Sequence, residues 1–350
     1  MDLSVNARLS VQEGLPEAWE QLLPPEPPRH LRRRWLSFAV RRMPGELLAL
    51  SIPGATTVGA LVRTPTGRRF NDPYLLLAEG CPEHQDRSER PWENLAESEV
   101  LPSLALTTPE YAFAASGDAG SVAALLTQTE DWARGQGAQT LVVLYVPEAS
   151  LSAAFLREAG YQSAVLAERC FLDVTWVDFE GYLGSLSASR RQSARRELRQ
   201  HDAAGLVEQH RFLRPHEPAL VELLVRHAER HGTPLDQKGA ESLLHELCAH
   251  FGPRNLDVFE VCTGEGTVVN FATFAREGSE LVCLLTGTDY DRDDARDCYF
   301  RTMFYMPAAQ AFDMGIASID YGIGATETKV GRGCRSVVML SFRKHLQDRA

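Results

Sequence analysis

The chain has 350 residues, of which 44% are hydrophobic and 24% are charged, and its net charge is −11 at pH 7. This size and composition are typical of a soluble globular enzyme with two or three domains. The acidic balance argues against a protein that coats DNA, so we expect no DNA partner. A local basic site for a phosphorylated ligand is still compatible with it.

The cysteines and the apolar segments indicate the compartment. The seven cysteines are scattered without a C-x-x-C pair, a usage typical of reduced cytosolic thiols. Residues 1–28 contain no basic segment followed by an apolar run, and no stretch of the chain approaches about 18 uninterrupted apolar residues. We therefore expect a cytoplasmic protein without a transmembrane segment, and the sequence leaves its oligomeric state open.

Hydrophobic patterns and turn residues predict a mixed order of helices and strands in the first half. The predicted elements are a helix at 31–43, strands within 47–62 and at 74–78 and 104–107, a helix at 121–134, a strand at 140–146, a helix at 151–159 and a strand at 167–174. The half thus runs from strands through helices to further strands.

The second half repeats that order after two helical segments. The predicted elements are a helix at 181–201, helices within 218–249 that break near Gly232 and Pro234, strands at 256–262, 268–275 and 280–285, a helix at 296–314, and strands at 316–321 and 337–342. The repeated order predicts an internal duplication, with one domain at 1–175 and a second at 176–350. The second domain has an inserted helical segment at about 181–250.

A short echo of residues accompanies the repeated order. At the helix-to-strand junction of each half, Ala133, Gly137, Ala138 and Leu141 match Ala311, Gly315, Ile316 and Ile319. A glycine that ends a helix before a buried strand is a general feature. The echo therefore supports a duplication only together with the order of the elements.

The stretch GYLGSLSASRRQSARRELRQH at 181–201 concentrates positive charge in an acidic chain. Its acid is Glu197, and its arginines are Arg190, Arg191, Arg195, Arg196 and Arg199. At helical spacing, every fourth residue from Arg191 lies on one face, while Leu183, Leu186 and Leu198 turn inward. Guanidinium groups bind phosphate and carboxylate oxygens bidentately. Two interpretations stay open, a solvated helix face and a substrate-binding helix.

An acidic run at 289–297 starts like a calcium-binding loop. It fails where such a loop needs a glycine, at Asp294, and where it needs a bidentate Glu, at Phe300. A solvated loop is one interpretation. In the other, Asp289, which comes just after an apolar strand and Gly287, points into a site as a base or as a ligand for an amine.

The glycine-rich segment YGIGATETKVGRG at 321–333 follows a predicted strand. It matches neither nucleotide-binding signature, since Glu327 stands where G-x-G-x-x-G needs its third glycine and no G-K-[ST] is present. We interpret the segment as a flexible turn that carries Lys329 and Arg332 beside the strand-end carboxylate of Asp320. A lysine in such a place can stabilise an oxyanion, and a plain surface loop is the alternative.

Neither a bound metal nor covalent catalysis is predicted. His227 and His231 lie one helical turn apart, followed by His245 and His250, but the string is HAERH rather than H-E-x-x-H. The sequence has no G-x-S-x-G motif, and no cysteine has a local catalytic motif.

The order of these motifs resembles a known family. In the first half, LLTQTEDWARGQGAQTLVVLYVPE and AAFLREAGYQ are similar to the central helix, strand and last helical turn of GNAT acyltransferases. In the second half, YLGSLSASRRQSARRELRQ and FYMPAAQAFDMGIASIDYGIGATETKVGRG resemble the tandem-GNAT branch of Fem-type peptidyltransferases and peptidoglycan-biosynthesis-like proteins. The resemblance implies two tandem GNAT-like α/β domains with mixed sheets, and transfer of an acyl group to an amine.

The family implies either aminoacyl-tRNA or acyl-CoA as the acyl donor, and no permanently bound cofactor. GNAT enzymes that use coenzyme A present R/Q-x-x-G-x-G/A before the central helix, where backbone N–H groups bind the pyrophosphate. The first half instead has ASGDAGSVAALL, with Asp118 in this cradle, and the second half has DYDRDDARDCYF. Acidic groups repel a pyrophosphate at a helix N-terminus. This departure favours aminoacyl-tRNA, which makes tRNA a candidate partner.

The leading hypothesis is an enzyme that forms an amide by moving an aminoacyl group to the amine of a cell-wall precursor, a peptide or a small natural product. The alternatives are an acyl-CoA-dependent N-acetyltransferase and a non-catalytic GNAT-like binding module. The family has a lysine near its closing strands, which implies an oxyanion role for Lys329, and Asp289 or Asp320 is the expected acceptor of the ammonium proton. The candidate substrate ligands are Arg190, Arg191, Arg195, Arg199, Asn270, Tyr305 and Arg332.

Overall fold

The computed structural model describes residues 8–23, 25, 27, 29–40, 46–63, 103–106, 113–115, 119–203, 205–232 and 235–346. The chain forms two compact units. Unit 1 comprises Met1–Glu168 and Val337–Ala350, and unit 2 comprises Arg169–Ser336. The end of the chain is thus grouped with the first unit, and the domain boundary suggested after residue 175 stays a prediction.

Unit 1 has a mixed sheet with the strand order β1-β2-β3-β4-β6-β13, and β5 pairs with β3 beside it. Its strands are β1 (Ser10–Glu13), β2 (Glu46–Ile52), β3 (Ala55–Val62), β4 (Ser103–Leu106), β5 (Phe113–Ala115), β6 (Thr140–Pro147) and β13 (Arg335–His345), which begins in unit 2. β4 and β6 run parallel, whereas the other printed pairs are antiparallel.

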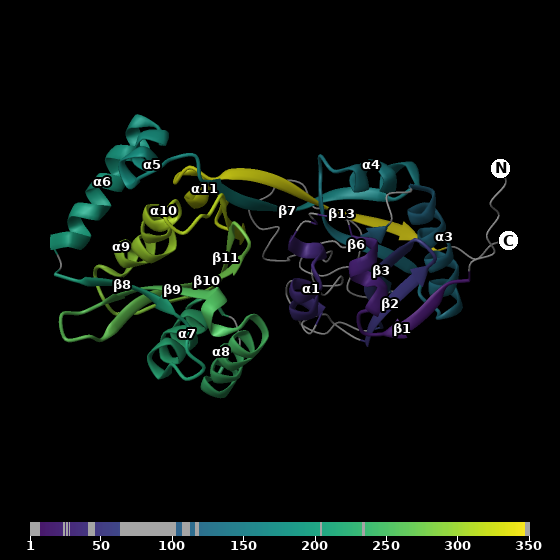
Figure 1. Ribbon diagram of the computed structural model, residues 1–350, viewed down its shortest axis with the longest axis horizontal. Helices are drawn as coiled ribbons and strands as arrows, with labels where there is room; N and C mark the ends of the chain where they lie inside the picture. Colours follow the sequence, from purple (N-terminus) through teal and green to yellow (C-terminus); the bar gives the residue numbers. More distant parts are fainter. Residues whose placement is uncertain are drawn as a thin grey trace. The chain divides into compact units, whose positions relative to one another are not determined.

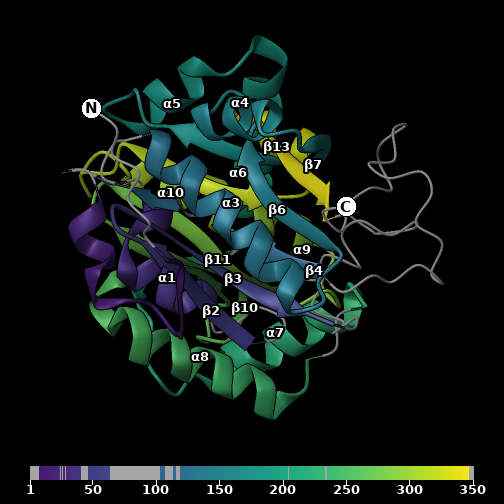
Figure 2. The same cartoon turned by 90° about the vertical axis from the view of Figure 1, so that its right-hand side faces the viewer.

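A helix joins the two parallel strands of unit 1, as a parallel crossover requires. The helices of this unit are η1 (Glu17–Leu22), η2 (Arg29–Leu31), α1 (Arg33–Val40), α3 (Ala119–Gly135) and α4 (Leu151–Glu158). Helix α3 packs on β2 and β3 (Figure 2). At its end Gly137 has a φ of 77°, and the N–H of Ala138 donates to the carbonyl of Ala133 at 2.9 Å. This left-handed cap turns the chain into β6.

Unit 2 has the strand order β7-β12-β11-β10-β9-β8, and β11 and β12 are its parallel pair. Its strands are β7 (Gln162–Asp173), which begins in unit 1, β8 (Val207–Phe212), β9 (Leu256–Cys262), β10 (Val268–Glu277), β11 (Glu280–Thr288) and β12 (Ser318–Ile323). Its helices are α5 (Phe179–Ser185), α6 (Ala188–Ala203), α7 (Pro218–Arg230), α8 (Gln237–Phe251), η5 (Pro253–Asn255), α9 (Ala295–Phe300), the π-helical turn η6 (Arg301–Tyr305), α10 (Met306–Gln310) and α11 (Thr326–Val330).

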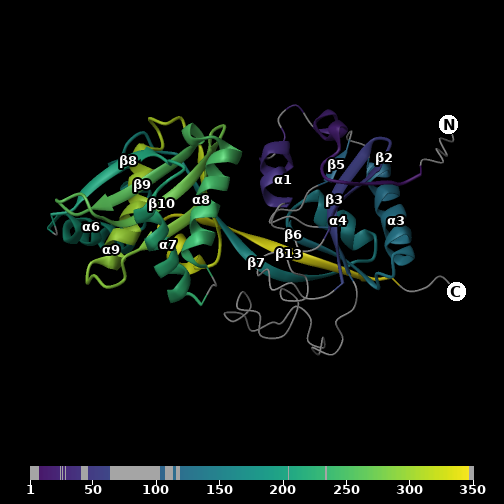
Figure 3. The ribbon, with the colours of Figure 1, turned by 90° about the horizontal axis from the view of Figure 1, so that it is seen from below.

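Helices cover both faces of the sheet in unit 2. Helix α7 packs on β10 and β11 with α8 beside it, and α9 and η6 pack on the opposite face (Figures 1 and 3). Gly287 on β11 permits the close approach of α7, because a Cβ there would lie 2.8 Å from the Cβ of Leu223 and 2.5 Å from the ring of Phe271. A larger residue would push α7 away from the strand.

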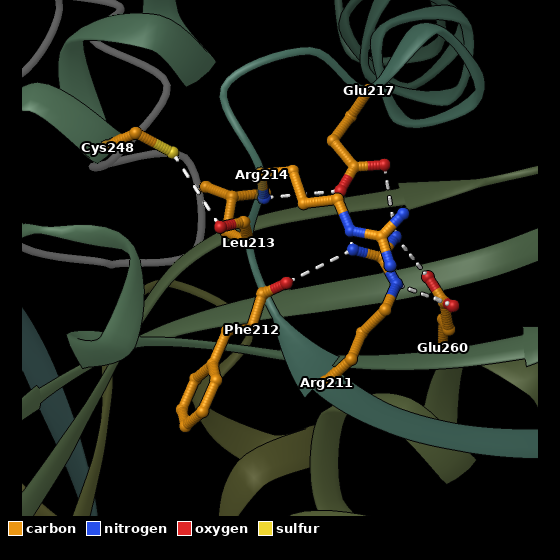
Figure 4. Close-up of polar contacts among 7 residues, drawn as sticks. All are labelled: Arg211, Phe212, Leu213, Arg214, Glu217, Cys248 and Glu260. Atoms are coloured by element: carbon orange, nitrogen blue, oxygen red, sulfur yellow. Dashed lines mark hydrogen bonds and ion pairs between the residues drawn. The ribbon is translucent and has the colours of Figure 1, made fainter.

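The edge strand β8 is held to its neighbours by a pair of carboxylates. The guanidinium of Arg211 lies between Glu260 on β9, at 2.8 and 2.9 Å, and Glu217, which precedes α7 (Figure 4). Two carboxylates around one guanidinium give charge-assisted hydrogen bonds on both sides of it. Arg211 therefore fixes the start of α7 relative to the sheet.

The structure confirms the mixed α/β class and differs from the predicted elements in three places. β8 (VEQHRF) was not predicted, because an edge strand with polar side chains lacks an apolar pattern. Helix α11 replaces the flexible turn that we predicted at 321–333. The helix predicted at 181–201 is two helices, α5 and α6, because the backbone of Leu186 is extended, with a ψ of 151°.

Candidate active site

The centre of β11 is one of the irregular points of the sheet in unit 2. Thr273 and Phe274 on β10 pair with Leu285 and Cys283, so Leu284 is an extra residue that forms a β-bulge. In the described part of the chain, the parallel pairing with β12 covers the first three residues of β11. Residues 283–286 are half-buried although the strand lies inside the sheet. An extended ligand can therefore pair with β11 as an additional strand beyond Val282.

Asn270 on β10 connects β11 with the π-helical turn η6. Its side chain is fully buried, and its Nδ2 donates to Oγ1 of Thr288 at 2.7 Å. Its Oδ1 accepts a short hydrogen bond from the hydroxyl of Thr302. Both ends of the amide are thus used inside the protein, and a role in substrate binding stays a prediction.

Lys329 on α11 is tied to the end of β12. Its ammonium donates to the carbonyls of Tyr321 at 2.8 Å, Gly322 at 3.2 Å and Ile323 at 2.9 Å. An ammonium has three N–H donors, so each has an acceptor. Burial lowers the pKa of Lys329. The oxyanion role stays a prediction, and it requires a substrate oxygen to replace one of these carbonyls.

The two predicted proton acceptors each pair with an arginine. Arg169 on β7 binds Asp320 through Nε and Nη2, the latter at 2.6 Å. Arg226 on α7 binds Asp289 at 2.8 Å. Asp320 pairs with Val282 near the start of β11, whereas Asp289 follows the end of that strand, so the two carboxylates are separated along it. Their role as bases stays a prediction.

The loop before α9 carries negative charge. Asp291 and Asp293 are exposed, Asp291 pairs with Arg226 at 3.1 Å, and Asp294 pairs with Arg292 at 2.7 Å. Among the described residues, no group of three or more His, Cys, Asp or Glu side chains is arranged to hold a metal ion. The corresponding Asp118 of the first half lies outside the described residues.

Helix α6 presents most of its arginines to solvent. Arg195 and Arg199 are exposed, and Arg195 pairs with Glu180 at 2.8 Å. The half-buried Arg191 donates to the carbonyl of Leu186 at 3.3 Å. The guanidinium of Arg190 lies close to Gly331, at the end of α11. The structure thus brings these predicted ligands onto one helix and leaves part of their charge accessible.

Glu197, the acid among the arginines of α6, turns into the core. Glu197 accepts hydrogen bonds from Nη2 of Arg332 at 3.1 and 3.2 Å and a short one from the hydroxyl of Tyr305. Arg332 also stacks on Phe300, with its Cζ 3.4 Å from the ring centroid. Burial, together with the hydrogen bond to Glu197, raises the pKa of Tyr305. Two predicted substrate ligands thus meet at a residue that we did not single out, although a lone acid among arginines was the signal.

Tyr290 is a second residue that the sequence analysis did not single out. Its hydroxyl lies 2.8 Å from Nδ1 of His227 and 3.5 Å from Nε2 of His231. The feature of the sequence that could have identified Tyr290 is its position, as an aromatic residue within an acidic run that directly follows a strand. The histidines that we weighed as metal ligands therefore contact a phenol instead.

Residues 188–330 match the family model of the acetyltransferase (GNAT) domain. This match indicates which class of enzyme the candidate site belongs to. Unit 2 carries a GNAT acyltransferase domain. The bulged strand β11, the acidic loop and helix α6 all belong to this GNAT domain or border it. A search of curated proteins gives no significant match.

Solved structures are similar to most of the chain, and not to the GNAT domain alone. FemX is 10% identical, with a TM-score of 0.57, over 96% of this chain and 97% of FemX. A tandem GNAT protein from the clavulanic acid biosynthesis pathway is 12% identical, with a TM-score of 0.53, over 98% of this chain and all of that one. L-PGS from Bacillus licheniformis is 10% identical, with a TM-score of 0.51, over 85% of this chain and 82% of that one. Over most of its length the chain therefore has the fold of these proteins, one of which is a tandem GNAT protein.

Within the residues that the structure describes, no helix is both long and apolar enough to cross a membrane.

Proposed function

We propose that the GNAT domain forms amide bonds by transferring an aminoacyl group from aminoacyl-tRNA to the amine of a cell-wall precursor, a peptide or a small natural product. The half-buried, bulged centre of β11 is the observation that supports acyl transfer, because an extended donor can bond to the backbone there. The amine attacks the donor carbonyl, and the resulting oxyanion needs a hydrogen-bond donor. Lys329 is the proposed donor, and Asp289 or Asp320 is the proposed base.

The charges of the domain support an ester donor over acyl-CoA. The pyrophosphate of coenzyme A binds best at a helix N-terminus without negative side chains. The loop before α9 exposes Asp291 and Asp293, and its neighbour Arg226 is already paired. Helix α6 instead exposes arginines that suit the phosphates of a nucleic acid. The acyl donor is thus a co-substrate, and tRNA is the proposed partner.

Donor binding tests this proposal. We expect the full chain to bind a pool of aminoacyl-tRNA with an affinity that falls as the salt concentration rises. Replacing Arg195 and Arg199 together with Ala is expected to weaken binding by about 1.5–3 kcal/mol for each charge-assisted hydrogen bond that the change removes. The free energy of unfolding is expected to change by less than about 0.5 kcal/mol for each exposed residue. Isothermal calorimetry and urea denaturation measure the two quantities.

A matched control replaces Arg214 and Arg254, two exposed arginines outside α6, with Ala. Equal weakening in this control would mean that the charge of α6 has no special role. Tight binding of acetyl-CoA without binding of aminoacyl-tRNA would support the acyl-CoA-dependent N-acetyltransferase instead. Binding without turnover of either donor, tested with a panel of primary amines, would support a non-catalytic module.

A further inference from the structure

A cavity of about 340 Å³ lies between the start of α7 and the first half of α8, two helices that lie side by side (Figures 1 and 3). Part of its lining is aliphatic, namely the prolines Pro215 and Pro218 and the nearly fully buried Val221 and Leu244. The volume is at the lower end of the range of small-molecule sites. The cavity therefore suits a small ligand with an aliphatic body.

The cavity and the candidate active site lie on different sides of α7. Leu223 on α7 closely approaches Gly287 on β11, whereas Val221 lines the cavity. Two positions along an α-helix are about 200° apart around its axis. A ligand in the cavity therefore does not occupy the space beside β11, and the cavity is a separate site.

The cavity presents a cation at the start of α8. Lys238 lines it, is exposed, and stands in the first turn of the helix. Within the described part of the chain, its ammonium has no ion-pair partner. A cation in the first turn of a helix is unfavourable, because the backbone already carries a partial positive charge there. A carboxylate bound beside Lys238 is favoured both by the ammonium and by the helix dipole. The exposed imidazoles of His216 and His245 also line the cavity.

Two carboxylates line the same cavity, and one of them is already paired. Glu217 turns toward Arg211, which donates to both of its oxygens (Figure 4). Glu241 is exposed, and it accepts a hydrogen bond at 3.2 Å from the side-chain amide of Gln237. Among the described residues it forms no ion pair, not even with Lys238. Because Glu241 follows Lys238 by three positions, the two side chains are neighbours on the surface of α8.

We propose that this cavity binds a free α-amino acid with an aliphatic side chain, such as leucine. The carboxylate of the amino acid binds Lys238, and its ammonium binds Glu241. Its side chain lies on Val221 and Leu244. A residue at the end of a peptide carries only one of the two charges on its α-carbon, so a free amino acid matches both. The inference concerns a second binding site and does not depend on the acyl transfer proposed above.

The experiment measures binding of three small molecules to the full chain by isothermal calorimetry at pH 7. L-Leucine carries both charges, 4-methylpentanoate lacks the ammonium, and 3-methylbutylamine lacks the carboxylate. Loss of one charge-assisted hydrogen bond typically weakens binding by roughly 10- to 150-fold. We therefore expect leucine to bind at least about tenfold more tightly than either of the other two molecules.

Two substitutions assign each charge of leucine to its partner. Lys238→Met is expected to weaken the binding of leucine and 4-methylpentanoate by about tenfold or more and to leave 3-methylbutylamine unchanged. Glu241→Gln is expected to weaken leucine and 3-methylbutylamine by a similar factor and to leave 4-methylpentanoate unchanged. The matched controls Arg254→Met and Glu229→Gln replace an exposed cation and an exposed acid that do not line the cavity. Both controls are expected to bind all three molecules normally.

The crossed pattern of losses upholds the proposal. Failure of leucine to bind at millimolar concentration overturns it, and so do equal affinities for leucine and the two molecules that lack one charge. Binding of leucine that survives both Lys238→Met and Glu241→Gln, or that falls equally in the two controls, places the ligand elsewhere and also overturns it. Melting temperatures of the four variants show that each is folded.

Discussion

Each unit contains an irregular strand, β6 in unit 1 and β11 in unit 2. In unit 1 the register between β6 and β13 shifts at Leu340 and Phe342, and Tyr145 on β6 has a φ of 59°. Nevertheless β6 is buried from Thr140 to Val146, because β13 pairs along it. In unit 2 the pairing of β12 stops before the bulge, and the strand stays half-buried there. A substrate can pair with an irregular strand only where no neighbouring strand already pairs with it. The unpaired part of β11 therefore makes unit 2 the better candidate for the substrate site.

The two units also differ in how they hold buried charge. In unit 1, Glu130 accepts from Lys344 at 2.9 Å and from the hydroxyl of Tyr161 at 2.9 Å, which ties α3 to its surroundings. In unit 2, Glu197 with Arg332 and the carbonyls around Lys329 hold α6 and α11. In unit 1 the anchored helix α3 packs on the sheet, whereas in unit 2 the anchored helix α6 packs on α5 and α9.

The largest expected effect comes from Glu197→Gln. The change leaves the guanidinium of Arg332 buried without its carboxylate, which typically costs about 3–5 kcal/mol of unfolding free energy. Urea denaturation followed by circular dichroism measures it. Glu180→Gln is the matched control, since it removes an exposed partner of Arg195 and is expected to cost less than about 1 kcal/mol. Equal losses in the two variants would show that Glu197 is not an anchor.

Lys329→Met is expected to have the next largest effect on stability. It removes three hydrogen bonds to backbone carbonyls, which together typically contribute about 2–4 kcal/mol to the free energy of unfolding. If Lys329 also donates to an oxyanion, kcat falls by about 10²-fold beyond any loss of folded protein, with little change in KM. Steady-state kinetics on the folded fraction separates the two roles. A normal kcat in the folded variant would leave Lys329 as a structural residue.

The smallest predicted effect compares the two helix-to-strand junctions directly. Gly315 has a φ of 69°, and the N–H of Ile316 donates to the carbonyl of Ala311 at 2.8 Å, as Ala138 does to Ala133 after Gly137. A Cβ at Gly137 or Gly315 would meet no atom within 4 Å. Gly137→Ala and Gly315→Ala are therefore each expected to cost about 1–2 kcal/mol, from the backbone alone. Clearly unequal losses of unfolding free energy would argue against equivalent junctions.

The sequence predicted most elements because apolar periodicity reports local burial. The echo of Gly137 and Gly315 is also local, and the structure gives both residues the same cap. The sequence analysis missed the edge strand β8, because its four central residues are all polar, and it missed α11, because that helix has only five residues.

The candidate site was harder to predict because its contacts are distant in sequence. Arg332 meets Glu197 across 135 positions, and Tyr290 meets His227 across 63. No local pattern encodes such pairs. Composition identified charged residues of interest, such as Arg332, but the side chain that each one contacts depends on the assembled sheet.

The path of the chain has a consequence for its synthesis. Unit 2 is one continuous segment, whereas unit 1 needs β13, which follows unit 2 in the sequence. A ribosome therefore completes the whole of unit 2 before it delivers the strand that pairs with β6. During this interval the apolar edge of β6 has no partner from β13, and such an edge invites pairing with other chains. This edge of β6 is thus available to other chains until the last residues of the protein have been made.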